Sequence, residues 1–167
     1  GGHFSPGGAT PVGTVDGIET RRLLLREFQL ADVEPLHGYC ADERLVFFLS
    51  WKANTHEKTQ EYVERCVSHQ DNSPRYSYEF VAARREDGHV IGHCQLHLVR
   101  KRPQAKMEVF VARREWGNGY GTEIVCALQA LAFGPLGLHR VYAEVPPADS
   151  ISARVLEKRG MQREGHL

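Results

Sequence analysis

The sequence predicts an α/β fold with a mixed, mostly antiparallel central sheet and helices on both faces. Three observations support this prediction. Apolar residues alternate with other residues in several short runs, which is typical of strands. In other segments they recur every three or four positions, which is typical of amphipathic helices. The expected order is strand, two helices, three strands, helix, strand, helix and strand, and 167 residues suit one domain with one core.

The bulk composition excludes several classes of protein. Lys plus Arg and Asp plus Glu both number 21, so the formal net charge is zero and nothing indicates nucleic acid or an anionic membrane as a partner. No apolar run is long enough to span a bilayer, and no signal peptide is expected. The four cysteines stand singly, outside any Cys-x-x-Cys pair, which indicates free thiols and a cytoplasmic protein.

The first elements follow from Gly and Pro content and from apolar spacing. Residues 1–14 are rich in Gly and Pro and are expected to form a flexible tail, with the folded domain over 15–167. Residues 18–28 predict a strand, and 30–41 predict an amphipathic helix. Thr55 is expected to cap a second helix. The apolar face of that helix comprises Tyr62, Val63, Cys66 and Val67.

The next segments predict a hairpin. Strands are expected over 76–84 and 89–100, joined by a tight two-residue turn at Asp87-Gly88. This turn would set Tyr78 opposite His97. The later elements are expected to be a strand over 105–112, a helix over 122–133, a strand over 140–145, a helix that Asp149 or Ser150 caps and Gly160 ends, and a strand over 161–166.

A glycine-rich segment joins an expected strand to an expected helix. Residues 114–123 read Arg-Glu-Trp-Gly-Asn-Gly-Tyr-Gly-Thr-Glu. The three glycines leave the backbone free of Cβ atoms, so a large anion can approach the N–H groups. The helix N-terminus adds unpaired donors and about half a positive charge. These features predict a phosphate-binding loop.

Three phosphate-binding patterns compete for this loop. A P-loop needs a lysine after its last glycine, and Tyr120-Gly121-Thr122 has none. The dinucleotide fingerprint needs its third glycine three residues after the second, whereas Gly121 follows Gly119 by two. The pattern Arg/Gln-x-x-Gly-x-Gly/Ala is matched by Arg114, Gly117 and Gly119. For these residues alone, a glycine-rich turn without a ligand is the alternative.

A second motif lies further along the chain. Residues 149–161 read Asp-Ser-Ile-Ser-Ala-Arg-Val-Leu-Glu-Lys-Arg-Gly-Met. In order and spacing, this stretch and the glycine loop resemble the motifs of the GCN5-related N-acetyltransferase (GNAT) superfamily. The string over 116–123 is most similar to the branch that includes ribosomal-protein alanine N-acetyltransferases. With the opening 18–26, the resemblance covers nearly everything after about residue 15.

The resemblance implies the GNAT fold and acetyl-CoA as cosubstrate. It implies that backbone groups of Phe110 and Val111 bind the pantetheine arm of CoA. Asp149 replaces the family's asparagine, and an ionised aspartate only accepts hydrogen bonds, which puts one contact to the cofactor or the helix in question. The family usually continues into a further strand, and without it a sheet edge is left for another partner, such as a second copy of the chain. The loop residues implied to bind the CoA pyrophosphate are Arg114, Gly117, Asn118, Gly119, Tyr120, Gly121 and Thr122.

Acetyl transfer to an amine requires a group that accepts the amine proton. Glu108 is the local candidate, because it breaks an apolar run on the strand that enters the loop. The alternative is a surface carboxylate on an alternating strand. Leu156 stands where many family members have a tyrosine acid, so that role does not transfer. Ser152 occupies the position that the resembled branch uses to donate to the CoA thiolate, with a backbone-bonded hydroxyl at the helix start as the alternative.

The acceptor amine is expected to contact Trp51, Tyr78 and His97. Trp51 lies in a region that borders the acceptor cleft in the family, with a packed connector as the alternative. His89, His93 and His97 share one expected strand face, which suggests a metal. However, four strand residues span about 13 Å at roughly 3.3 Å each, and two ligands at about 2.1 Å from one metal lie far closer. We therefore expect a polar cleft wall and no metal.

The sequence thus predicts an acetyl-CoA-dependent N-acetyltransferase that acts on a primary amine, either a protein N-terminal α-amine or a small-molecule amine. The alternative is a non-catalytic CoA-binding regulatory module, which Asp149, Leu156 and the early C-terminus favour. Release of free CoA thiol in the presence of amines distinguishes the two.

Overall fold

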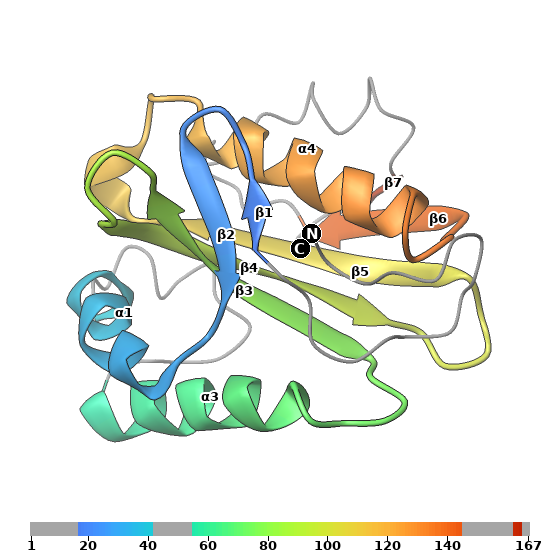
Figure 1. Cartoon of the computed structure of the whole chain (residues 1–167), viewed down its shortest axis with the longest axis horizontal. Coiled ribbons are helices and arrows are strands. Elements are labelled where there is room, and N and C mark those ends of the chain that lie inside the picture. Colours follow the sequence, from blue (N-terminus) through green and yellow to red (C-terminus); the bar gives the residue numbers. More distant parts are fainter. Residues whose placement is uncertain (1–16, 42–54, 145–161, 165–167) are drawn as a thin grey trace.

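The computed structural model describes residues 17–41, 55–144 and 162–164. These residues contain a seven-stranded sheet whose strands follow one another in space as in sequence (Figure 1). Neighbouring strands from β1 to β5 are antiparallel, whereas β5, β6 and β7 are parallel. The predicted mixed, mostly antiparallel sheet is confirmed. The strands are β1 Ile18–Glu19, β2 Leu23–Glu27, β3 Ser77–Arg84, β4 Val90–Leu98, β5 Gln104–Val111, β6 Arg140–Glu144 and β7 Gln162–Glu164.

Helices cover both faces of the sheet, with α1 and α3 on one face and α4 on the other (Figure 1). The predicted cap of the second helix is confirmed, since Thr55 Oγ1 accepts a hydrogen bond from the Lys58 N–H at 3.2 Å. This bond satisfies one of the N–H groups that a helix start leaves without a partner. The helices are α1 Val33–Cys40, α3 His56–His69 and α4 Tyr120–Phe133, and the short 3-10 turns are η1 Leu30–Asp32 and η2 Arg113–Glu115.

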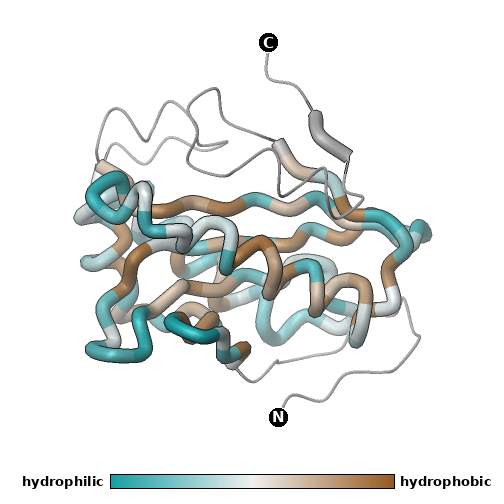
Figure 2. The backbone as a smooth tube through the Cα atoms, turned by 90° about the horizontal axis from the view of Figure 1, so that it is seen from above, coloured by the Kyte–Doolittle hydropathy of each residue, from teal (hydrophilic) through white to brown (hydrophobic). Residues whose placement is uncertain are grey.

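The sheet separates two apolar layers. The layer against α4 includes Phe80 and Leu128, and the layer against α1 and α3 includes Phe28 and Val63. Figure 2 shows apolar segments along the central strands and hydrophilic turns at the strand ends. Because successive strand residues point to opposite faces, a one-residue difference decides which helices a side chain meets.

The expected first strand over 18–28 is interrupted. A turn at Thr20 divides it into β1 and β2, which pair as a short antiparallel hairpin. The Thr20 N–H donates to the Leu23 carbonyl at 2.8 Å, and Thr20 Oγ1 accepts from the Leu23 N–H at 3.0 Å. Such local side-chain bonds to the backbone compete with strand pairing, which explains the break.

The expected register of the β3–β4 hairpin is wrong by one residue. The turn is longer than Asp87-Gly88, since the Gly88 N–H donates to the Arg84 carbonyl at 2.7 Å and the Arg84 N–H donates to the His89 carbonyl at 2.8 Å. A bulge between Ala82 and Ala83 then shifts the pairing again. As a result His97 lies opposite Ser77 and not opposite Tyr78.

Several sequence predictions concern residues outside the described ranges, namely the tail over 1–14, Trp51 and the helix that contains Asp149 and Ser152. The expected strand over 161–166 corresponds to β7. All four cysteines are free thiols. In the described part of the chain, no helix has the length and apolar character needed to cross a membrane.

We predict that Gly92→Ala destabilises the fold, because the backbone of β5 lies close to Gly92 on β4. An added Cβ would lie 2.2 Å from the Phe110 carbonyl oxygen and 3.1 Å from Val111 Cα, so backbone atoms must move. The free energy of unfolding should fall by about 3 kcal/mol, the upper part of the range for overpacking, and Tm by roughly 10 °C. Thermal unfolding of this variant and of the unmodified protein, followed by circular dichroism, measures both quantities.

Gly38→Ala in α1 is the matched control. An added Cβ at Gly38 meets no atom within 4 Å, and alanine favours a helix by about 0.5–1 kcal/mol over glycine. Tm should therefore rise slightly. Equal Tm values for Gly92→Ala and the unmodified protein would contradict the close approach of β4 and β5.

Candidate active site

The glycine loop connects the end of β5 to α4 and presents unpaired backbone donors. Gly117 and Gly119 have left-handed backbones with φ of 87° and 81°, a conformation that costs little only for glycine. The first bond of α4 runs from the Glu123 N–H to the Gly119 carbonyl at 3.2 Å. The N–H groups of the three preceding residues, 120–122, therefore have no carbonyl within the helix to bind.

Open space lies over the two glycines. Within the part of the chain that the structure describes, an added Cβ at Gly117 would meet no atom within 4 Å, and one at Gly119 would meet only Arg22 Nη2, at 3.5 Å. An anion can therefore reach this backbone and also the positive end of α4. The geometry fits the phosphate-binding loop that the glycine spacing predicts.

Side chains of the loop stabilise its conformation. Trp116 Nε1 donates to the Val111 carbonyl at 2.8 Å, and Asn118 Nδ2 donates to the Glu115 carbonyl at 3.1 Å. The exposed guanidinium of Arg114 contacts His89 Nε2 and lies 3.6 Å from a carboxylate oxygen of Glu115. Arg114 and Asn118 thus brace the loop with their side chains, a role that the motif alone does not reveal.

Glu123 anchors the start of α4 to the β1–β2 turn. Its carboxylate accepts hydrogen bonds from Thr20 Oγ1 and, at 2.8 Å each, from the backbone N–H and Nε of Arg22. Burial alone would raise the pKa of Glu123, but these hydrogen bonds and the Arg22 charge outweigh it and hold the pKa below its usual value. The sequence analysis missed this anchor, which joins residues about one hundred positions apart.

Strand β5 extends four residues beyond its last described pair with β6. That pairing runs from Gln104↔Arg140 to Met107↔Ala143. On the other edge of β5, the Ala112 N–H donates to the Ile91 carbonyl at 2.8 Å. Backbone groups alternate between the two edges of a strand, so those of Val109 and Val111 face away from β4.

This alternation corrects one expectation. The backbone groups of Phe110, two residues before Ala112, face β4, where His93 is the partner residue. They do not face the edge opposite β4, whereas the backbone groups of Val109 do. The Phe110 ring instead packs on the His93 ring, with centroids 4.6 Å apart. Val111 does face the edge opposite β4, although its carbonyl already accepts the Trp116 bond.

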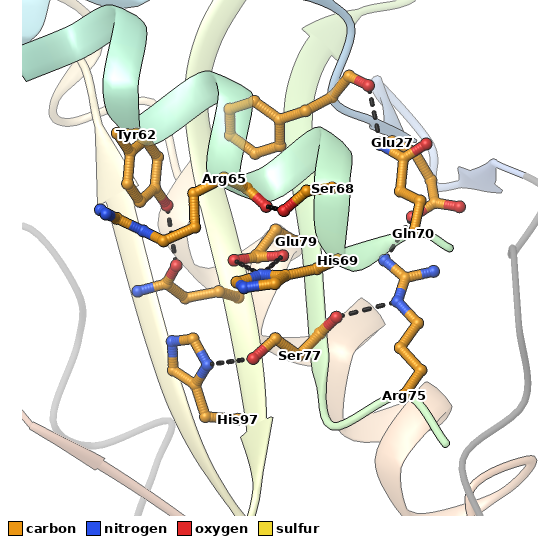
Figure 3. Close-up of polar contacts among 12 residues, drawn as sticks. Glu27, Tyr62, Arg65, Ser68, His69, Gln70, Arg75, Ser77, Glu79 and His97 are labelled. Atoms are coloured by element: carbon orange, nitrogen blue, oxygen red, sulfur yellow. Dashed lines mark hydrogen bonds and ion pairs between the residues drawn. The ribbon is translucent and has the colours of Figure 1, made fainter. Parts of the chain in front are cut away.

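A row of three buried polar side chains crosses the sheet beneath α3. Glu79 on β3 lies opposite Gln95 on β4, which lies opposite Glu108 on β5. Their exposed fractions are 3%, 3% and 8%. Two α3 residues bind this row: His69 Nδ1 lies 2.9 Å from both carboxylate oxygens of Glu79, and the Tyr62 hydroxyl donates to Gln95 Oε1 at 2.7 Å (Figure 3).

The adjacent row toward the β4–β5 turn contains Ser77, His97 and Lys106. Ser77 Oγ lies 3.0 Å from His97 Nδ1 (Figure 3). Lys106 Nζ lies 3.7 Å from Glu108 Oε1. Burial lowers the pKa of the half-buried His97 imidazole, against the opposing charges of Glu108 and Glu79. The His97 imidazole is therefore neutral at pH 7.

Two expected roles change with the corrected register. Tyr78 points to the α4 side of the sheet, is fully buried and lies under the Arg75 guanidinium at 4.4 Å. It cannot line a cleft together with His97, which lies on the α3 side. The bulge that shifts the pairing is the cause.

The three histidines do not form one stripe. His89 precedes β4 and contacts Arg114, whereas His93 is fully buried and bonds the Tyr39 hydroxyl. Burial lowers the pKa of His93 to about 3. Among the residues that the structure describes, no group of three or more His, Cys, Asp or Glu side chains is arranged to hold a metal ion.

Comparison with known proteins gives the family. A family model for the acetyltransferase (GNAT) domain matches residues 22–162. The uncharacterized N-acetyltransferase YnaD of Bacillus subtilis (strain 168) is 27% identical over 148 residues, which cover 89% of this chain and 84% of that protein. A GNAT-family acetyltransferase from Bacillus anthracis is 27% identical, with a TM-score of 0.73 over 89% of this chain and 85% of that one.

Two solved structures from Vibrio cholerae share the fold at lower identity. A proposed ribosomal-protein-serine acetyltransferase has a TM-score of 0.74 at 19% identity and covers 89% of this chain and 84% of that one. A spermidine N-acetyltransferase in complex with CoA and spermine has a TM-score of 0.70 at 18% identity, over 89% and 85% of the two chains. Because the family model matches most of the sequence, the chain belongs to the GNAT acetyltransferase family and is an acetyl-CoA-dependent N-acetyltransferase.

Proposed function

We propose that the protein transfers the acetyl group of acetyl-CoA to a primary amine and that Glu108 accepts the amine proton. The observation that carries this proposal is the position of Glu108. Its buried carboxylate lies on the strand that leads into the glycine loop, one residue beyond the last described pair between β5 and β6. It thus adjoins the part of β5 that lies beyond the described pairing with β6.

The CoA portion of the substrate fits the loop and the edge of β5 opposite β4. The backbone N–H groups of residues 117–122 would bind the pyrophosphate, with Gly117 and Gly119 leaving space for it. The polar backbone groups of Val109 and the N–H of Val111 would bind the amides of the pantetheine arm. One such N–H would also stabilise the oxyanion that forms on the thioester carbonyl.

The chemical step is then a direct transfer. The neutral amine nitrogen attacks the thioester carbonyl carbon, the carbon–sulfur bond breaks, and the amine proton passes to Glu108 directly or through a water molecule. The departing thiolate takes a proton, for which we propose Ser152. Lys106 Nζ lies 3.7 Å from Glu108 Oε1, so a positive charge stands beside the proposed base.

The acceptor is proposed to be a protein N-terminal α-amine or a small-molecule amine that enters over the polar rows, beside His97. Solved structures that share this fold include both a spermidine N-acetyltransferase and a proposed ribosomal-protein-serine acetyltransferase. A panel that contains spermidine, an amino-sugar and a short peptide with a free N-terminus separates these classes by thiol release from acetyl-CoA. CoA binding without thiol release for any amine would favour the regulatory-module alternative.

Gly119→Val tests the phosphate loop. The new side chain would stand where the pyrophosphate is proposed to lie, so affinity for acetyl-CoA should fall by at least about 100-fold, equivalent to one or two charged hydrogen bonds. The positive φ of Gly119 also imposes backbone strain on valine. Gly88→Val is the control, because Gly88 has a similar φ of 75° and open space but lies outside the loop. Calorimetry that finds unchanged affinity for Gly119→Val excludes the proposed cradle.

Glu108→Gln tests the base. The amide keeps the size of the side chain but cannot take the proton, so kcat should fall by about 10²- to 10⁴-fold while acetyl-CoA affinity stays nearly constant. Glu79→Gln is the comparison, since Glu79 lies in the same row but is bonded by His69. If Glu108→Gln keeps the unmodified kcat and Glu79→Gln does not, the base is Glu79.

A further inference from the structure

An arginine-lined pocket lies beside the start of α4. Its volume of about 460 Å³ falls within the range of small-molecule sites. Residues from the β1–β2 turn and from the β3–β4 turn meet there, because Leu23 pairs with Arg84 and the Arg85 N–H donates to the Arg22 carbonyl at 2.9 Å. The lining residues of this arginine pocket are Arg21, Arg22, Arg84, Arg85, Glu86 and Tyr120.

The arginine pocket is continuous with the glycine loop. The Arg22 guanidinium lies 4.4 Å from the centre of the Tyr120 ring, the first residue of α4. Arg22 Nη2 also lies 3.5 Å from the position that a Cβ of Gly119 would occupy. A ligand on the loop backbone would therefore have Arg22 at its side.

The arginines in this pocket divide into two groups. Arg84 and Arg85 are engaged, since Arg84 bonds Asp87 and lies near Glu115, and Arg85 Nη1 donates to the Thr20 carbonyl. These two side chains form part of the wall of the arginine pocket.

The other two arginines keep donors available. Arg22 uses Nε for Glu123 and leaves both Nη groups outside that bond. The exposed side chain of Arg21 forms no hydrogen bond or ion pair with any residue of the described ranges. Two guanidinium groups whose remaining N–H donors have no partner among the described residues are suited to a phosphate, which guanidinium groups bind in a bidentate manner.

We propose that the arginine pocket binds the 3′-phosphate of CoA through Arg21 and Arg22. This inference rests on the proposed binding of the CoA pyrophosphate at the glycine loop. The pyrophosphate and the 3′-phosphate are attached to the same ribose, so the second phosphate must lie within one sugar of the first. The arginine pocket meets this condition because it begins at Gly119 and Tyr120.

Another basic segment does not meet that condition. Arg100, Lys101 and Arg102 form the β4–β5 turn, at the start of β5, whereas the loop follows the end of β5. The eight residues of β5 separate them by about 26 Å at roughly 3.3 Å per residue. A phosphate one sugar away from the loop cannot reach this turn.

Calorimetric titration with CoA and with dephospho-CoA, which lacks only the 3′-phosphate, tests the proposal. The unmodified protein should bind CoA about tenfold to a hundredfold more tightly, the value of one hydrogen-bonded charge pair. Arg21→Gln should remove most of this preference by weakening CoA while leaving dephospho-CoA unchanged. Arg21 is exposed and unpaired among the described residues, so its replacement leaves the fold intact. Arg102→Gln, the control at the opposite end of β5, should keep the preference.

Three outcomes would overturn the inference. One is equal affinity of the unmodified protein for CoA and dephospho-CoA. The second is an equal loss of both ligands in Arg21→Gln, which would assign Arg21 to the pyrophosphate. The third is a loss of the preference in Arg102→Gln. If the unmodified protein binds neither ligand, the proposed CoA site itself fails. If it binds dephospho-CoA but shows no preference for CoA, only the arginine pocket fails, because dephospho-CoA lacks the 3′-phosphate alone.

Discussion

Strand β5 has neighbours that run in opposite directions, and the candidate site depends on this constraint. It is antiparallel to β4 along its length and parallel to β6 only up to Met107 in the described pairing. Beyond that point its side chains and backbone serve different purposes. Glu108 turns toward α3, the backbone of Val109 turns away from β4, and the strand then enters the glycine loop. One strand therefore brings the proposed base within two residues of the proposed cofactor edge.

The polar row beneath α3 costs stability that an apolar row would not. Removing a carboxylate from water is unfavourable unless hydrogen bonds and charges replace the solvent. Glu79 has His69, Gln95 has Tyr62, and Glu108 has Lys106 nearby. Two of these partners, His69 and Tyr62, lie on α3, so α3 must sit in one position for Glu79 and Gln95 to keep their hydrogen bonds.

Local chemistry explains which features could be predicted from the sequence. The glycine loop and the Thr55 cap depend on neighbouring residues, and both have the expected position. The face of Tyr78 depends on a bulge between Ala82 and Ala83, for which the sequence carries no clear signal. The backbone groups of Val109 face away from β4 and those of Phe110 face it. The alternation of apolar residues in the sequence does not predict the edge to which a backbone amide points. The arginine pocket could not be predicted, because Arg22 and Arg85 meet only through the pairing of β2 with β3.

Arg22 lies between the two proposed phosphate sites and also stabilises the fold. Its backbone N–H and Nε hold Glu123 at the start of α4, while its remaining donors lie beside Gly119. Loss of Arg22 would leave the buried part of Glu123 with fewer donors and would move the helix start that presents the loop amides. An affinity change in such a variant would mix helix position with phosphate contact. Arg21 lines the same arginine pocket but does not bond Glu123. A substitution of Arg21 therefore changes the charge of the pocket without moving the glycine loop.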